Sequence, residues 1–288
     1  MKANTEIVDR MPDNADKFLD PFFKRFELRH APQPLQLNER VTKNYRFPTL
    51  YSDVTCAIGI FMCDYQQAKA ILPHPGLRPV RMTKGRSLVV FSCYEYKNVM
   101  NVLPYNEISM MIPVLNEPKL DLPILPMVAA GFFPSMGYYV FSMPVTSKEN
   151  QLRGNKIWGL PKVTEDIDVT EDRGDCVTVA HDSDGAAYFE LRVPMAGAPS
   201  KFDVSTNLYS KLENRFLTSR TNFTASFNVN KHMGVLFKKG AKPDRPYLKL
   251  GNSPRSTLLR GLEIEEQPFQ FRYAKHMNAA FDLPYKVV

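Results

Sequence analysis

Residues 163–193 read VTEDIDVTEDRGDCVTVAHDSDGAAYFELRV, and the fold class is clearest in this segment. Its first part, Val163–Val169, alternates apolar and polar side chains with the period of a half-buried strand. Cys176–Ala180 and Ala187–Val193 are further short runs of β-forming residues, and the turn-forming sequences RGD and DSDG separate the three runs. Three short strands joined by two tight turns predict an antiparallel meander.

Other segments of the chain also favour strands over helices. Leu88–Phe91 and Tyr105–Val114 are rich in β-forming residues, whereas Asp64–Leu72 predicts a short helix that Asp64 caps and Pro73 ends. Strands and helices do not alternate along the chain, so a parallel doubly wound sheet is not expected. We therefore predict an α+β, mainly β fold, with an antiparallel barrel-like sheet and a few flanking helices.

We predict one domain preceded by an N-terminal arm, because no repeat, low-complexity run or Gly/Ser linker divides the chain of 288 residues. The arm comprises residues 1–40, and the single barrel-like domain comprises residues 41–288. Within the arm, Phe18, Phe22 and Phe26 recur every four residues, which predicts an amphipathic helix. Docking of this helix on the protein's own core is expected, although a helix lying on a membrane surface has the same pattern.

The composition indicates a globular protein in a reducing compartment. Hydrophobic residues make up 44% and charged residues 23% of the chain, as is typical of soluble domains. The amino terminus lacks the apolar core of a signal peptide, and the uncharged segment Leu122–Ser147 contains four prolines, so no membrane span is expected. The four cysteines form no C-x-x-C pair, which favours inert thiols and a cytoplasmic location.

The net charge of +7 is concentrated in one part of the sequence. Lys231–Arg260 contains eight basic residues and one acidic residue, so this stretch alone carries +7. No zinc finger, RRM signature or set of stacking aromatics accompanies it, and nucleic acid is therefore not expected as a partner. The stretch is interpreted as a solvated face or a subunit contact, or alternatively as a patch that steers anionic substrates.

Several common cofactor and metal sites are absent from the sequence. No two glycines are two residues apart, so G-x-G-x-x-G cannot occur. Gly154 and Gly159 have the spacing of a P-loop, but Leu160 stands where that motif needs a lysine. The chain contains no G-x-S-x-G, and its five histidines lack metal-ligand spacing. We predict neither a metal nor a cofactor.

Lys162 is the first candidate for chemistry. It lies in residues 157–163, IWGLPKV, which contain the only tryptophan of the chain. Gly159 and Pro161 restrict the backbone just before a strand, so Lys162 projects from a rigid element among apolar neighbours. Such surroundings disfavour the ammonium form and lower the pKa of a lysine, and the neutral amine can form a Schiff base with a carbonyl. The alternative is an ordinary surface lysine after a turn.

Glu107 is the second candidate. It belongs to a strand that is otherwise uncharged, and no basic residue occurs from Asn98 to Leu115. On a strand, Glu107, Ser109 and Met111 share one face. That face either meets solvent or points the carboxylate into an apolar pocket, where a buried charge needs a partner.

Together the two segments resemble the acetoacetate decarboxylase family. The matching pieces, spread over about residues 45–195, are LP…GL at 72–77, PYNE at 104–107 and G…IWGLPK at 154–162. The resemblance implies that Lys162 forms a Schiff base with substrate, and that Glu107 places the amine and assists proton transfer. It also implies a mainly antiparallel barrel-like fold, in agreement with the strand pattern, and assembly into homo-oligomers.

The candidate substrate pocket consists of Tyr105, Ser109, Met111, Trp158, Leu160 and Val163. The sequence departs from the family at Val163, where acetoacetate decarboxylases have a second lysine. Leu50 and Ser92 fall near the places of an arginine and a second glutamate that the family has. Charged residues elsewhere that are candidates to replace them are Arg81, Arg86 and Glu95.

These features predict a cofactor-independent decarboxylase that forms a lysine imine with a small β-keto acid similar to acetoacetate. One alternative uses the same imine for aldol-type addition or dehydration of a 2-oxo acid. Another is a non-enzymatic protein that binds an apolar ligand in the same barrel and leaves the lysine idle.

Overall fold

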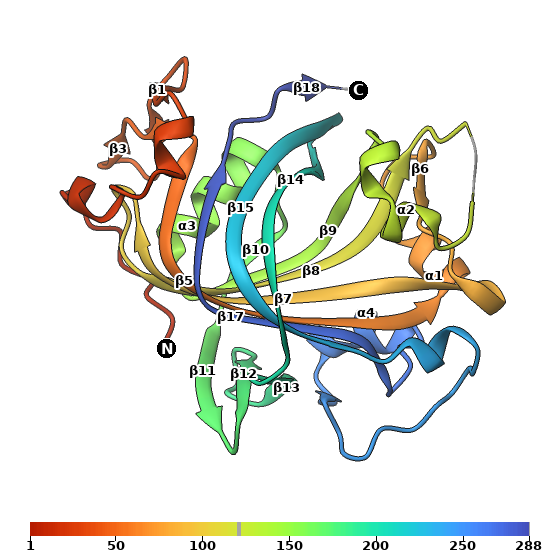
Figure 1. Cartoon of the computed structure of the whole chain (residues 1–288). Helices are drawn as coiled ribbons and strands as arrows, with labels where there is room; N and C mark the ends of the chain where they lie inside the picture. Colours follow the sequence, from red (N-terminus) through yellow and green to blue (C-terminus); the bar gives the residue numbers. More distant parts are fainter. Residues whose placement is uncertain (120–121, 288) are drawn as a thin grey trace.

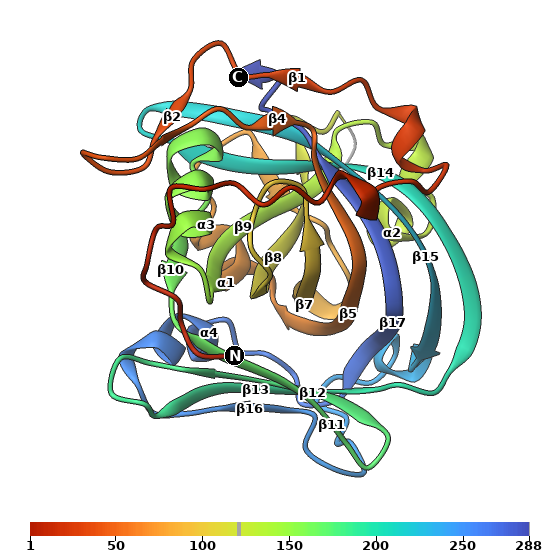
Figure 2. The ribbon, with the colours of Figure 1, turned by 90° about the vertical axis from the view of Figure 1, so that its left-hand side faces the viewer.

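Seven strands close into a barrel in the computed structural model, which describes residues 1–119 and 122–287 (Figures 1 and 2). In order around the ring they are β9 (Met136–Val145), β14 (Ala198–Leu212), β15 (Arg215–Lys231), β17 (Pro268–Phe281), β5 (Thr49–Asp64), β7 (Arg86–Val99) and β8 (Tyr105–Asn116), and β8 pairs back with β9. Every pair in the ring is antiparallel except β9 with β14. The predicted mainly antiparallel, barrel-like fold is confirmed.

Short elements flank the ring. β6 (Leu77–Pro79), β10 (Lys162–Thr164) and β18 (Lys286–Val287) pair with β8, β9 and β15, while β1 (Arg29–His30) pairs with β4 (Arg46–Phe47) and β2 (Leu35–Gln36) with β3 (Thr42–Lys43). The helices are α1 (Tyr65–Ala70), α2 (Leu125–Val128), α3 (Lys148–Arg153) and α4 (Thr257–Gly261), with shorter turns η3 (Thr83–Gly85), η4 (Ala130–Phe132), η6 (Met233–Leu236) and η7 (Pro254–Ser256). Helix α1 confirms the predicted short helix, because Asp64 accepts hydrogen bonds from the backbone N–H groups of its first turn. Among the helices of the described residues, none has the length and apolar character to cross a membrane.

The predicted meander forms a second sheet outside the barrel (Figure 1). It consists of β11 (Asp166–Asp172), β12 (Asp175–His181) and β13 (Ala187–Pro194), with β16 (Leu248–Leu250) at its edge. The expectation of one continuous first strand from Val163 is wrong, because Lys162–Thr164 pairs with the barrel and the meander begins at Asp166. Between them, buried Glu165 accepts a 2.6 Å hydrogen bond from the Tyr188 hydroxyl, which holds the chain where it changes sheets.

An apolar layer joins this second sheet to the barrel. Phe91 and Ile108, on the outer faces of β7 and β8, belong to the same buried cluster as Phe189 and Leu191 of β13. The opposite face of β8 points into the barrel, and the strand is buried along almost its whole length. Burial on both faces explains why the sequence of β8 is nearly continuous in apolar residues.

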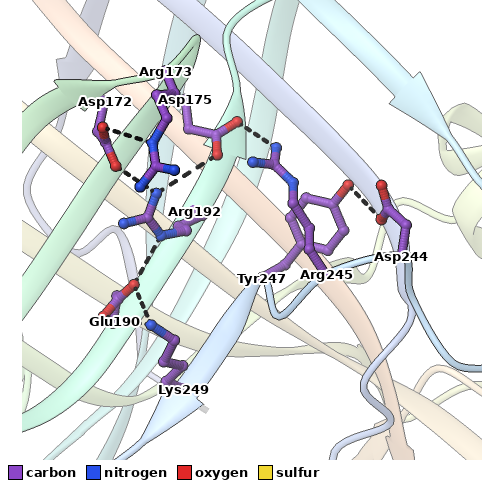
Figure 3. Close-up of polar contacts among 9 residues, drawn as sticks. All are labelled: Asp172, Arg173, Asp175, Glu190, Arg192, Asp244, Arg245, Tyr247 and Lys249. Atoms are coloured by element: carbon purple, nitrogen blue, oxygen red, sulfur yellow. Dashed lines mark hydrogen bonds and ion pairs between the residues drawn. The ribbon is translucent and has the colours of Figure 1, made fainter.

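Part of the basic stretch is held against the meander by ion pairs (Figure 3). Arg245 Nη2 lies 2.7 Å from Oδ1 of the buried Asp175, and Lys249 Nζ lies 3.1 Å from Glu190 Oε1. These acids belong to β12 and β13, whereas the bases belong to the segment that leads to β16 and to β16 itself. The stretch therefore makes structural contacts within the chain, in addition to any role for its remaining charges.

The N-terminal arm does not form the predicted amphipathic helix. It contains two isolated 3₁₀ turns, η1 (Ala15–Lys17) and η2 (Phe23–Arg25). Between them, Asp20 Oδ1 accepts a hydrogen bond from the N–H of Phe22, and Pro21 has no N–H to donate, so a continuous helix is interrupted. Phe18, Phe22 and Phe23 are nevertheless buried in one cluster with residues of the barrel, as docking on the core requires.

All four cysteines are buried and form no disulfide. Burial raises the pKa of each thiol, which disfavours the reactive thiolate. The interpretation of the cysteines as inert thiols agrees with this environment.

Candidate active site

The barrel encloses a cavity of about 140 Å³. Side chains from all seven strands of the ring line it, together with Leu160 and Lys162, and most of them are apolar or aromatic. Within the described part of the chain, its charged lining residues are Glu107, Lys162 and Arg272. A largely apolar cavity with a few converging polar groups is typical of a small-molecule site.

The structure brings Lys162 and Glu107 together. Lys162 Nζ donates a hydrogen bond of 2.5 Å to Glu107 Oε2, and the two side chains are only 7% and 5% exposed. Glu107 comes from the inner face of β8, and Lys162 comes from β10 at the edge beyond β9. The alternatives of a surface lysine and a solvent-facing glutamate are therefore excluded.

Tyrosine rings surround the other side of the pair. The Tyr96 hydroxyl donates to Glu107 Oε1 at 3.3 Å, so each carboxylate oxygen has one partner. Burial raises the pKa of Tyr96 well above its usual range, so this phenol stays protonated and remains a donor. The ring of Tyr105 lies 5.7 Å from Lys162 Nζ, within the range of a cation–π contact when the amine is charged.

The loop before Lys162 is fixed by a turn of π-helix, η5 (Gly154–Trp158), that continues α3. Asn155 holds both sides of the Lys162 peptide: its Oδ1 accepts from the Lys162 N–H at 3.2 Å, and its Nδ2 donates to the Lys162 carbonyl at 3.3 Å. Gly159 ends the turn with a φ of +62°, which favours glycine, and a Cβ there would lie 2.3 Å from the carbonyl oxygen of Lys211. The Ser210 hydroxyl donates to the Trp158 carbonyl at 2.5 Å and ties the same turn to β14.

Gly154 makes room for the side chain of Lys162. A Cβ at position 154 would lie 2.4 Å from Lys162 Cδ and 2.7 Å from Cε. The backbone of Gly154 is helical, with φ −60° and ψ −46°, so close approach rather than conformation requires the glycine. The two glycines of the motif therefore serve different contacts, one with the amine-bearing side chain and one with β14.

The pKa of Lys162 is lowered from its ordinary value. Burial is the largest cause, because it penalises the ammonium form, and the positive charge of Arg153 acts in the same direction. The carboxylate of Glu107 opposes the shift through its charge and its hydrogen bond. Desolvation outweighs this opposition, which favours the neutral amine that nucleophilic attack requires.

Arg153, the last residue of α3, was not among the predicted site residues. It is 1% exposed and donates to Thr49 Oγ1 at 3.0 Å, with its guanidinium carbon 4.3 Å from the centre of the Tyr45 ring. The candidates named from the sequence lie elsewhere: Arg86 pairs with Glu265, Glu95 accepts a hydrogen bond from Thr55, and neither these two nor Arg81 lines the cavity. Ser92 does line it, whereas Leu50 packs against the phenylalanines of the arm.

Three of the six residues predicted for the substrate pocket line this cavity, and three do not. Ser109, Met111 and Leu160 line the cavity. Trp158 packs against Phe47 and Phe281 and donates to the Asp282 carbonyl instead. Val163 follows Lys162 on β10, so its side chain projects from the opposite face. Tyr105 is covered by Tyr96, at 4.8 Å between ring centres. Trp158 and Tyr105 therefore support the cavity from behind its lining, through Phe281 and Tyr96.

Sequence reasoning missed several lining residues. One face of β7 contributes Ser92, Tyr94 and Tyr96 to the lining. These residues alternate with Phe91, Cys93 and Glu95, and this alternation indicates in the sequence that they share a face. Arg272 on β17 also lines the cavity. No local pattern marks it, because a register shift between Ala274 and Met277 interrupts the alternation that links Arg272 to the lining residues Met277 and Ala279.

Substitution Gly154→Ala tests the close contact with Lys162. Alanine is about 1 kcal/mol more favourable than glycine in a helix, so we expect little loss of stability. The added methyl group, however, forces the side chain of Lys162 to move. The expected fall in kcat/KM is about 100-fold, the size of effect that a displacement near 1 Å produces. Steady-state kinetics and thermal unfolding measure the two quantities. Gly234→Ala is the control, since no atom lies within 4 Å of a Cβ at that position. Unchanged kinetics in Gly154→Ala contradict the contact.

Comparison with known proteins identifies the family. The family model for acetoacetate decarboxylase (ADC) matches residues 31–229, which is more than half of the chain. No curated protein matches. The structure of acetoacetate decarboxylase from Legionella pneumophila subsp. pneumophila str. Philadelphia 1 has a TM-score of 0.60 at 14% identity, covering 100% of this chain and 98% of that chain.

Two other solved structures share the fold. A second acetoacetate decarboxylase structure has a TM-score of 0.57 at 14% identity, over 85% of this chain and 90% of that chain. The enduracididine biosynthesis enzyme MppR, with HEPES buffer bound, has a TM-score of 0.53 at 12% identity, over 84% of this chain and 86% of that chain. At these identities the likeness concerns the fold, and the family model carries the assignment. The chain belongs to the acetoacetate decarboxylase family.

Proposed function

We propose that this protein is a cofactor-independent decarboxylase that forms an imine between Lys162 and a small β-keto acid. The observation that carries the proposal is the buried amine of Lys162, with its lowered pKa, 2.5 Å from Glu107 in a largely apolar cavity. Membership of the acetoacetate decarboxylase family supports the same reaction class.

The reaction begins with attack of neutral Lys162 Nζ on the ketone carbon. The ketone oxygen takes up protons and leaves as water, which gives a protonated imine. The bond from the α-carbon to the carboxylate then breaks, carbon dioxide leaves, and the electron pair moves through the α-carbon to the imine nitrogen to form an enamine. Protonation of the enamine carbon and hydrolysis of the imine release the ketone and restore the amine.

Glu107 is the group that exchanges protons with the amine in this scheme. It lies in direct hydrogen-bond contact with Nζ, as a general acid or base must. The Tyr96 hydroxyl donates to its other oxygen and fixes the orientation of the carboxylate. The apolar lining assists the central step, because loss of carbon dioxide disperses the negative charge of the carboxylate, which apolar side chains solvate poorly.

Borohydride trapping with a panel of keto acids tests the proposal. The expected result is reduction of the imine to a stable secondary amine on Lys162, located by peptide mass mapping, together with release of carbon dioxide from untreated reactions. Trapping at another lysine, or turnover without any trapped adduct, contradicts the mechanism. Binding of keto acids with neither imine nor turnover supports instead a protein that only binds apolar ligands.

A second candidate uses the same imine for aldol-type addition or dehydration of a 2-oxo acid. It is favoured by one observation on a protein of the same fold: a structure of MppR holds the condensation product of pyruvate and imidazole 4-carboxaldehyde, with a TM-score of 0.53 at 11% identity, over 90% of this chain and 97% of that chain. Product analysis separates the two candidates. Carbon dioxide release indicates decarboxylation, whereas a product that gains the mass of an aldehyde or loses water indicates the second reaction.

A further inference from the structure

Arg272 places a second cation in the cavity wall. It belongs to β17 and lines the same cavity as Lys162 and Glu107. Its Nε donates to Gln270 Oε1 at 2.7 Å, and its guanidinium carbon lies 4.9 Å from the centre of the Phe202 ring. Stacking and one hydrogen bond thus hold the side chain in place.

The charge of Arg272 has no acidic partner among the described residues. Lys162, by contrast, is paired with the cavity's single carboxylate. An arginine has five N–H donors, and in the described chain only the Nε–H of Arg272 has a hydrogen-bond acceptor. Burial lowers its pKa, as expected of a cation removed from water without a counter-charge. The terminal N–H groups are therefore available to an anionic ligand.

Arg272 lies away from the reacting amine. Glu107 is in register with Tyr94 of β7, which pairs with Cys56 of β5, which in turn pairs with Ala274 of β17. Arg272 is two residues from Ala274, in the next layer of the same wall. β7 and β5 lie between β8 and β17, so Glu107 and Arg272 project into the cavity from strands that are three places apart in the seven-strand ring. An anion at Arg272 is thus a different part of the ligand from the carbonyl at Lys162.

We propose that Arg272 binds a second carboxylate of the substrate, one that survives the reaction, so that the preferred substrate is a 3-oxo diacid. The inference rests on the proposed imine at Lys162. The carboxylate that leaves is a poor ligand for Arg272, because an ion pair stabilises the ground state of a group that must lose its charge. The leaving carboxylate is also only one carbon away from the ketone that reacts with Lys162, whereas Arg272 projects from β17, on another side of the barrel.

A matched pair of substrates tests this inference. 3-Oxohexanedioate and 3-oxooctanedioate are compared with their ω-methyl esters, which keep the length and the leaving carboxylate but lack the far charge. Wild-type protein is expected to prefer at least one diacid over its ester by about 10- to 100-fold in kcat/KM. This is the range that corresponds to the loss of one hydrogen bond to a charged group. Arg272→Met is expected to abolish the preference, because it raises the KM of the diacid more than the KM of its ester. Arg272→Lys is expected to retain part of it.

The control variant is Arg220→Met, since Arg220 also stacks on an aromatic ring, that of Tyr285, but does not line the cavity. It should keep the full preference. Absence of a preference in the wild type, or its persistence in Arg272→Met, overturns the inference. Borohydride trapping of a neutral ketone, butanone, keeps the two proposals apart. Trapping on Lys162 without a diacid preference removes only the role of Arg272, whereas failure to trap butanone and every keto acid removes the proposed imine and, with it, the inference.

Discussion

Lys162→Arg is expected to give a folded protein with no detectable turnover. Arginine carries a positive charge on a side chain slightly longer than that of lysine, so its guanidinium still reaches the carboxylate of Glu107. The guanidinium stays protonated at any working pH and cannot form an imine. Loss of activity in this variant therefore reports loss of the nucleophile. Carbon dioxide release and borohydride trapping measure the chemistry, and thermal unfolding measures the fold.

Lys156→Arg is the matched control for this experiment. Lys156 belongs to the same turn, but it is exposed and donates to the carbonyl of Gln36. Its replacement should leave the rate and the trapped adduct unchanged. Appreciable turnover in Lys162→Arg, or an adduct on Lys156 in the wild type, would refute the assignment of the nucleophile.

The fold was largely predictable because its decisive segments carry local signals. The meander is defined by alternation and by turn residues within residues 163–193, and all three of its strands are present. The closure of the barrel has no such signal. It depends on the parallel pairing of β9 with β14, whose paired residues, such as Gly137 and Asn207, are far apart in the sequence. The point at which the first strand changes sheets likewise depends on tertiary contacts of Glu165.

The candidate site was predictable where one short motif carries it. The glycines and proline around Lys162 indicate a rigid loop before a strand, and the lone charge of Glu107 in an apolar strand indicates a buried partner. Arg153 and Arg272 were missed, because what sets them apart is their tertiary surroundings. Val163 does not line the cavity, because neighbours on a strand point to opposite faces and Lys162 points into it.

Glu107→Gln is expected to separate imine formation from proton transfer. Glutamine has nearly the same size and still offers an oxygen to Lys162 or Tyr96, so the fold should persist. Loss of the acid–base group should lower the rate of carbon dioxide release by about 10²- to 10⁴-fold. The carboxylate raises the pKa of Lys162, so its removal leaves burial and Arg153 to lower that pKa further. The neutral amine is the reactive form. In the plot of trapping rate against pH, the fall of the rate on the acid side should therefore move to lower pH.

The two readouts together make this prediction specific. Damage to the site as a whole would slow trapping and turnover alike at every pH, whereas the proposed role predicts trapping that survives to lower pH while turnover falls. Glu95→Gln is the control, because Glu95 lies on β7 beside the tyrosines but does not line the cavity. Its pH profile should match that of the wild type. An acid-side fall that is unshifted in Glu107→Gln would mean that the carboxylate does not set the protonation of Lys162, and an undiminished rate would assign proton transfer to another group.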